Sequence, residues 1–188
     1  MKKLMMIAAL MLATMSANAQ GMFVKPMVGG TLATLTGDGV KDAKMKVGLV
    51  AGAEFGINFS EQFGVTAGLL YSMQGSGIKD SDHNWNTDYL NIPILANYYI
   101  IPGLAVKAGI QPGILTRAKY GDHDYKDYLE SLDISIPMGL SYEFSDFVID
   151  ARYDLGLTDI LKSENGMHWD AKAKNSVIML TIGYKIPL

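Results

Sequence analysis

The sequence predicts an all-β protein: an eight-stranded antiparallel up-and-down transmembrane β-barrel, preceded by a cleaved signal peptide. Three observations predict this fold. The final strand divides its side chains by position into an apolar and a mixed face, the same alternation recurs in seven earlier segments, and the connections alternate between short and long. Successive side chains of a strand point to opposite faces, so a wholly apolar face suits contact with lipid.

The N-terminus has the features of an export signal. Lys2 and Lys3 precede an apolar run over 4–15, and the small residues at 17–19 form a cleavage site. The run is shorter than the roughly 20 residues that a membrane-spanning helix needs, which favours a cleaved signal over an anchor helix. We therefore expect a signal peptide over 1–19 and a single barrel domain over 20–188.

Composition narrows the class of protein further. The chain has no cysteine, which excludes a lipid-modified cysteine anchor and any disulfide framework. It has 16 basic and 19 acidic residues, a net charge of −3, and no basic face for nucleic acid. The location is indicated by the strand alternation together with the export signal, and it is the outer membrane of a Gram-negative bacterium.

Eight segments carry the alternation, and each exceeds the roughly 9–11 tilted residues that cross a bilayer. Pro93, Pro112 and Pro137 fall inside three of them, and because each lacks a ladder donor we expect bulges or local kinks there. The predicted strands are 23–34, 45–58, 63–74, 87–100, 104–117, 131–144, 147–158 and 175–188.

From the second predicted strand onward, one face of each strand is apolar and almost free of charge. A basic residue on the lipid face at the bilayer midplane would cost about 2–4 kcal/mol. The predicted lipid-facing residues are Leu49, Ala51, Phe55 and Ile57; Val65, Leu69 and Tyr71; Leu90, Ile92, Ile94 and Tyr98; Leu104, Val106, Ile110 and Ile114; Ile134, Ile136, Leu140, Tyr142 and Phe144; Phe147, Ile149, Tyr153 and Leu155; and Ile178, Leu180, Ile182, Tyr184, Ile186 and Leu188.

The connections sort by length in the way that outer-membrane barrels require. Three are short turns, at 58–63, 101–103 and 145–146. The other four are long, polar and charged, and they cover 35–44, 75–86, 118–130 and 159–174. Short periplasmic turns and longer external loops are typical of these barrels, and an even strand count returns the C-terminus to the periplasmic side.

The opposite face of the strands carries the charged residues. Eight strands leave an interior just wide enough for side chains to fill. Charges of both signs in that space should pair, because an unpaired buried charge is costly. We expect a lumen plugged by ion pairs, with a narrow polar conduit as the alternative. The predicted lumen charges are Lys25, Lys46, Glu54, Lys107, Glu143, Asp150, Arg152, Asp154 and Lys185, with Arg117 and Asp133 near the outer rim.

Aromatic residues gather at both ends of the strands. Rings beside the short turns suit a periplasmic girdle at the level of the lipid headgroups. That predicted girdle consists of Phe55, Phe63, Tyr98, Phe144 and Phe147. The long loops hold Trp85, Trp169, Tyr120, Tyr125 and Tyr128, which could form an outer girdle or contact a partner.

Histidines supply the weak candidates for chemistry. His83, His123 and His168 each lie in a different long loop, beside aspartates. If the loops converged, these residues could bind a metal or activate water. They lack the spacing of a ligand motif, so we expect no catalytic residue, no metal and no cofactor. An enzyme with its active site in these loops is kept as a hypothesis beside a membrane barrel and a soluble carrier.

Several segments match one family in order along the chain. They are KPMVGGTLATLTGD at 25–38, VTAGLLYSMQG at 65–75, DYLNIPILANYY at 88–99, GLAVKAGIQPG at 103–113, GLSYEF at 139–144 and ARYDLGLT at 151–158. On these segments the chain resembles the PorT-like outer-membrane β-barrel family of small eight-stranded barrels. The resemblance implies a membrane barrel whose relatives include some tied to secretion or surface assembly.

The sequence therefore predicts a small outer-membrane barrel with a side-chain-filled lumen. We expect a monomer embedded in outer-membrane lipid, with a structural role or a protein partner at its external loops, and no nucleic acid. The alternatives are a soluble lipocalin-like carrier of an apolar ligand, which also has eight alternating strands, and a narrow-pore channel. A carrier would place the apolar face inward, and parity alone does not say which face is inward.

Overall fold

The computed structural model describes residues 21–37, 43–78, 84–121, 123–161 and 173–188. The signal peptide predicted over 1–19 lies outside the described residues, as do His83, His168 and Trp169. The part of the chain that the structure describes holds no helix long and apolar enough to cross a membrane.

Eight extended segments cross the molecule, close to the predicted ones. The fourth is made of two strands in line, β5 and β6, and β12 continues β11 at the end of the chain. The long strands are β1 (Met22–Thr36), β3 (Lys46–Asn58), β4 (Phe63–Ile78), β5 (Asn84–Asn91), β6 (Ile94–Ile101), β7 (Leu104–Tyr120), β9 (Leu132–Phe144), β10 (Phe147–Gly156) and β11 (Lys174–Tyr184). The short elements are β2 (Ala43–Lys44), β8 (His123–Asp124), the 3-10 turn η3 (Lys126–Tyr128) and β12 (Ile186–Pro187).

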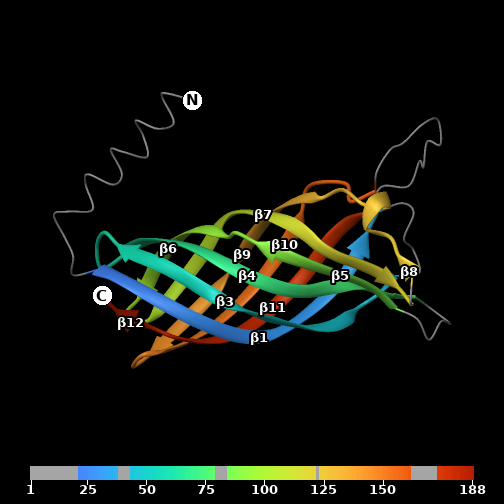
Figure 1. Cartoon of the computed structure of the whole chain (residues 1–188). Coiled ribbons are helices and arrows are strands. Elements are labelled where there is room, and N and C mark those ends of the chain that lie inside the picture. Colours follow the sequence, from blue (N-terminus) through green and yellow to red (C-terminus); the bar gives the residue numbers. More distant parts are fainter. Residues whose placement is uncertain (1–20, 38–42, 79–83, 122, 162–172) are drawn as a thin grey trace, which may run out of the picture.

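The strands form a closed antiparallel barrel (Figure 1). Each segment pairs with its neighbours in chain order, and β1 pairs with β11 from Met27↔Gly183 to Thr36↔Lys174, which closes the ring. The start of β1 and β12 lie at the end of the barrel with the short turns, whereas β8 lies at the other end. The prediction of a closed eight-stranded antiparallel barrel is confirmed.

Buried and exposed residues alternate along the strands, with polar residues buried and apolar residues exposed, as in a membrane barrel. In β10 every second residue is buried, and the buried positions include Asp150, Arg152 and Asp154. The outward positions are apolar, and Leu49 on β3 is 63% exposed. Of the residues predicted to face lipid, none is buried. The apolar face is therefore outside and the charged face inside.

The three prolines within strands disturb the barrel less than the sequence suggested. Pro93 interrupts the fourth segment between β5 and β6, but the register against β4 and β7 is the same on both sides of it. Pro112 and Pro137 stay within β7 and β9 with no register shift, so the expectation of bulges was wrong at these two positions. The β7–β9 ladder is nevertheless interrupted beside Pro137, between Ala108↔Met138 and Gln111↔Ser135. A proline loses only its N–H, and its carbonyl still pairs: Ile92 N donates to Pro112 O over 2.8 Å.

One bulge lies elsewhere, near the outer end. The β5–β7 register shifts between Asp88↔Arg117 and Tyr89↔Leu115, so that Thr116 is the extra residue. Its Oγ1 donates to Asp88 O over 2.8 Å, which satisfies a carbonyl at the irregularity. This bulge places Arg117 opposite Asp88 on the outer rim.

Side chains replace ladder bonds where β3 and β4 separate. The regular ladder ends at Val50↔Ser72. Beyond it, Thr31 Oγ1 on β1 donates to Met73 O over 2.7 Å, and Lys46 Nζ donates to Gln74 O over 2.7 Å. The Thr31 hydroxyl reaches β4 across Gly48, where a Cβ would overlap Met73 O and lie 2.6 Å from Thr31 Oγ1.

Replacing Gly48 with valine tests this seam. We expect Gly48→Val to lower the free energy of unfolding by about 1–3 kcal/mol, because the added side chain must displace Thr31 or the β4 backbone. The measurement is urea unfolding in lipid vesicles, followed by the heat-dependent gel mobility of the folded barrel. Gly30→Val is the matched control, because the nearest atom to its added Cβ is Gly48 O at 3.8 Å. Equal losses in the two variants would contradict the account of the seam.

Candidate functional site

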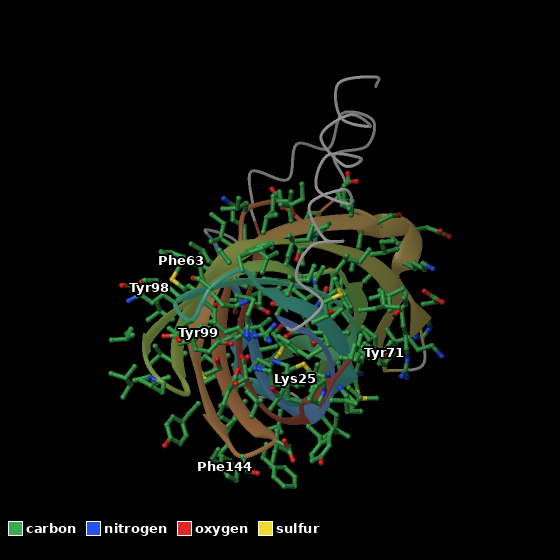
Figure 2. The ribbon with its side chains drawn as sticks, turned by 90° about the vertical axis from the view of Figure 1, so that its left-hand side faces the viewer. Lys25, Phe63, Tyr71, Tyr98, Tyr99 and Phe144 are labelled. Atoms are coloured by element: carbon green, nitrogen blue, oxygen red, sulfur yellow. The ribbon has the colours of Figure 1, made fainter. Side chains whose placement is uncertain are left out.

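A network of buried ion pairs fills the middle of the lumen. It joins Lys25 on β1, Glu54 on β3, Lys107 on β7, and Asp150 and Arg152 on β10, all at most 6% exposed. Figure 2 shows Lys25 near the centre of the ring of strands, seen from the end with the short turns. We call these five residues the lumen network.

The contacts of the lumen network are close and reach across the barrel. Lys25 Nζ lies 2.8 Å from Glu54 Oε2, and Lys107 Nζ lies 2.5 Å from Asp150 Oδ2. Arg152 donates through Nε to Asp150 Oδ1 over 2.6 Å and through Nη2 to Glu54 Oε1. Because Arg152 holds carboxylates from two strands that are not neighbours, it ties opposite walls of the barrel together.

Strand register and glycines make room for this network. Lys25 and Glu54 are directly opposite each other in the β1–β3 ladder, and Asp150 and Arg152 share a face two residues apart. A Cβ at Gly68 would lie 2.7 Å from Glu54 Cγ, and one at Gly183 would lie 2.9 Å from Lys25 Cγ. A larger residue at either glycine would push a charged stem out of place.

Two further predicted lumen charges pair at the end with the short turns. Lys185 Nζ lies 2.7 Å from Glu143 Oε2, and Tyr99 Oη donates to Glu143 Oε1 over 2.8 Å. The Lys185 ammonium group also lies 4.4 Å from the centre of the Phe23 ring. These half-buried groups cover the mouth below the lumen network.

The remaining predicted charges lie toward the outer end and do not join the network. Asp154 accepts from Gln111 Nε2 over 3.1 Å, and Asp133 accepts from Asn175 Nδ2 over 2.8 Å. Lys46 donates to the Gln74 carbonyl. Arg117, whose side chain is half exposed, lies 3.6 Å from the Asp88 carboxylate.

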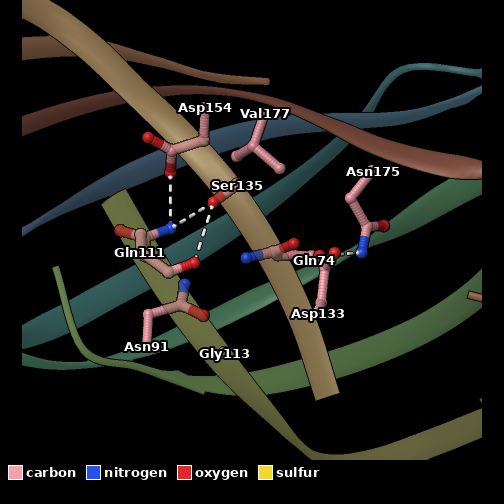
Figure 3. A pocket seen from close by; sticks show the side chains of 9 residues that line it. All are labelled: Gln74, Asn91, Gln111, Gly113, Asp133, Ser135, Asp154, Asn175 and Val177. Carbon is pink, nitrogen blue, oxygen red and sulfur yellow. Dashed lines mark hydrogen bonds between the residues drawn. The ribbon is translucent and has the colours of Figure 1, made fainter. Parts of the chain in front are cut away.

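Asp133 and Asp154 border a small polar cavity of about 10 Å³, roughly the space that one water molecule needs. Its lining residues, drawn in Figure 3, are Gln74, Asn91, Gln111, Gly113, Asp133, Ser135, Asp154, Asn175 and Val177.

An apolar cluster, which we call the apolar cap, is buried inside the barrel on the outer side of this cavity. It consists of Tyr89, Leu115, Ala118 and Leu129, with Leu161 packed against it. Leu129 and Leu161 form an isolated antiparallel bridge, and Glu130 N donates to Ile160 O over 2.9 Å. The cap was not expected from the sequence, because Leu129 and Leu161 lie in stretches predicted to be polar loops. Their only signal was an isolated leucine in each.

Aromatic rings gather outside the cap. The ring centroids of Trp85 and Tyr120 lie 5.3 Å apart, those of Trp85 and Tyr125 5.0 Å, and those of Tyr125 and Tyr128 6.0 Å. Tyr128 is 70% exposed. We call these four residues the outer aromatic cluster.

The five residues of the predicted periplasmic girdle are all exposed beside the short turns. Phe63 and Tyr98 lie 4.9 Å apart between ring centroids, and Phe144 and Phe147 lie 5.7 Å apart. Figure 2 shows Phe63, Tyr98 and Phe144 on the outside of the ring. Tyr184, which the girdle prediction left out, lies 5.2 Å from Phe147.

The described residues include only one of the three histidine candidates. His123 lies exposed in β8, and the other two histidines are outside the described residues. Within the described ranges, no group of three or more His, Cys, Asp or Glu side chains is placed to hold a metal ion. The chemistry that the described side chains offer is therefore charge pairing inside and aromatic contact outside.

Removing Arg152 tests the lumen network. We expect Arg152→Met to lower the free energy of unfolding by about 3–5 kcal/mol, because Glu54 and Asp150 lose a buried partner. Arg117→Met is the matched control, since its half-exposed pair with Asp88 is worth at most about 1 kcal/mol. Urea unfolding in vesicles measures both. If the two variants lose the same stability, the lumen network is not a major source of it.

The comparisons with known proteins agree with this geometry. A family model described as the outer membrane protein beta-barrel domain matches residues 17–162. No curated protein matches the chain significantly.

Two solved structures illustrate the likeness. One is Ail, the attachment invasion locus protein of Yersinia pestis, in complex with the heparin analogue sucrose octasulfate: it is 19% identical with a TM-score of 0.54, covering 89% of this chain and 99% of Ail. The other is Neisserial surface protein A, which is 13% identical with a TM-score of 0.57, covering 89% of this chain and 97% of that protein. At such identities the likeness supports the fold alone. Because the family model spans most of its length, the chain belongs to the outer membrane protein β-barrel domain family.

Proposed function

We propose that this protein is a sealed, monomeric scaffold in the outer membrane of a Gram-negative bacterium, which contacts a protein partner through its external end. The observation that carries the proposal is the filled lumen. Five charged side chains at most 6% exposed occupy its middle. A barrel whose interior is closed does its work at its surface, as a support for the groups that it displays.

The narrow-conduit alternative is disfavoured by what fills the interior. An aqueous path would have to pass the Arg152 pairs, the one-water cavity and the apolar cap in turn. Eight strands give little room to move these groups aside. The same interior disfavours a carrier, because a lipocalin-like protein would line its cavity with apolar residues, whereas here Lys25 and Glu54 face inward.

The outer aromatic cluster is the surface that best suits a partner. Tyrosine and tryptophan are enriched among the residues that dominate protein interfaces. Tyr128 is exposed on η3, and the neighbouring Lys126 and Asp127 supply both signs of charge. The hydrogen bond from Tyr125 N to Ala118 O, at 3.0 Å, anchors this turn to the end of β7. The surface is thus held by the barrel rather than by the loop alone.

The narrower parts of the proposal rest on the sequence. We assign the chain to the PorT-like barrels because its segments resemble that family in the same order along the chain, above all DYLNIPILANYY at 88–99. A role accessory to secretion or surface assembly follows from this assignment. Export rests on the signal peptide over 1–19.

Photo-cross-linking in intact cells tests the proposal. A photoreactive amino acid at Tyr128 should form a covalent adduct with one protein partner, because this side chain is displayed at the external end. Tyr142 is the matched control site, since it is 50% exposed on the outer wall of β9 and should contact only lipid. The adducts are identified by mass spectrometry. Only lipid or abundant bystander proteins at Tyr128 would argue for a purely structural barrel.

A further inference from the structure

The polar cavity between the lumen network and the apolar cap is bordered by negative charge that the lumen network does not neutralise. It is bordered by two carboxylates, Asp133 and Asp154 (Figure 3). Within the described residues, no lysine or arginine ammonium or guanidinium group lies within ion-pair distance of either one. Both are buried, at 7% and 3% exposed.

The deeply buried charges of the described lumen do not balance. Apart from Asp88, which is 2% exposed and pairs with Arg117 at the outer rim, the charged side chains at most 7% exposed are three cations and four carboxylates. The cations are Lys25, Lys107 and Arg152, and the carboxylates are Glu54, Asp133, Asp150 and Asp154. The excess is one negative charge, and an uncompensated charge in such a place is strongly unfavourable.

The neighbouring cations are engaged elsewhere. Arg152, two residues before Asp154 on β10, directs Nε and Nη2 to Asp150 and Glu54. Its Nη1 has no hydrogen-bond partner among the described residues, but it does not come within ion-pair distance of Asp154. Lys46 is only half-buried, and its ammonium group donates to the Gln74 carbonyl. The excess charge therefore rests on the cavity.

Unpartnered oxygens lie at the same cavity. Asp154 accepts one hydrogen bond, from Gln111, through Oδ2. Among the described residues, neither Asp154 Oδ1 nor Gln111 Oε1 has a hydrogen-bond partner, and both side chains are 3% exposed. A buried carboxylate oxygen left in this state costs free energy unless a hydrogen-bond donor or a cation meets it. The amide Nδ2 of Asn91, which lines the same cavity, also has no partner among the described residues.

We propose that this cavity binds one small monovalent cation of the sodium type. Oxygen atoms from carboxylate and amide groups are the donors that hard cations prefer. A single positive charge neutralises the excess, and the cavity of about 10 Å³ holds one small ion but no larger ligand. The described residues give no third carboxylate for a divalent metal. The ion completes the lumen filling, so this inference is independent of any partner at the external end.

Salt-dependent unfolding of the whole mature barrel tests the proposal. A ligand that binds only the folded state raises its stability. The protein is folded and then unfolded by urea in sodium chloride or in N-methylglucamine chloride, at equal ionic strength and fixed pH. The urea midpoint should be higher in sodium. In Asp154→Asn, which removes the excess charge, the midpoint should be the same in both salts. Asp124→Asn, in exposed β8, is the control that should keep the sodium dependence.

A second measurement uses the unaltered protein, in case Asp154→Asn does not fold. Crystals grown with thallium(I), a heavy monovalent cation, should show an anomalous peak beside Asp154. The proposal requires both the sodium-dependent midpoint of the unaltered barrel and this peak. Equal midpoints in the two salts, or no peak in the cavity, would overturn it and leave a proton or a water molecule as the group that meets Asp154.

Discussion

The interaction on which the rest of the structure depends is the pairing of Arg152 with Glu54 and Asp150 inside the barrel. A lipid-facing exterior forces the polar half of every strand inward, and eight strands leave no room for bulk water to solvate it. The charges must therefore satisfy one another. Arg152 does this with a planar group that can serve two carboxylates at once. Because Glu54 and Asp150 come from separate walls, this arrangement of charges requires the closed barrel.

This constraint divides the molecule into layers along its axis. At the end with the short turns, the Glu143–Lys185 pair covers the mouth. The lumen network follows, then the small polar cavity, and then the apolar cap of Tyr89, Leu115, Ala118 and Leu129. Outside the cap lies the outer aromatic cluster. In the proposed sealed barrel, each layer would block passage for a different physical reason, and the external end would be the surface on which a partner acts.

The alternation of apolar and polar residues along the strands made most of this fold predictable. It could not predict which side chains meet across the barrel. The alternation of Ile178, Leu180 and Ile182 identifies a lipid face without any knowledge of the strand's neighbours. Parity also placed Glu54 and Arg152 inside, but it did not say that they meet, because β3 and β10 are not adjacent. The cap escaped prediction because Leu129 and Leu161 come from segments expected to be loops, where polarity does not alternate with a fixed period. The bulge at Thr116 depends on a local hydrogen bond that a pattern of polarity does not record.

We propose above all that ions do not pass through the lumen of the folded barrel from one end to the other. Single-channel recording across planar bilayers tests it most directly, using protein whose gel mobility shifts on heating and is therefore folded. The account predicts no conductance steps above the bare membrane at any voltage the bilayer tolerates. Discrete, repeatable steps from the folded protein would contradict it, because they would mean that the lumen network and the cap do not seal the lumen.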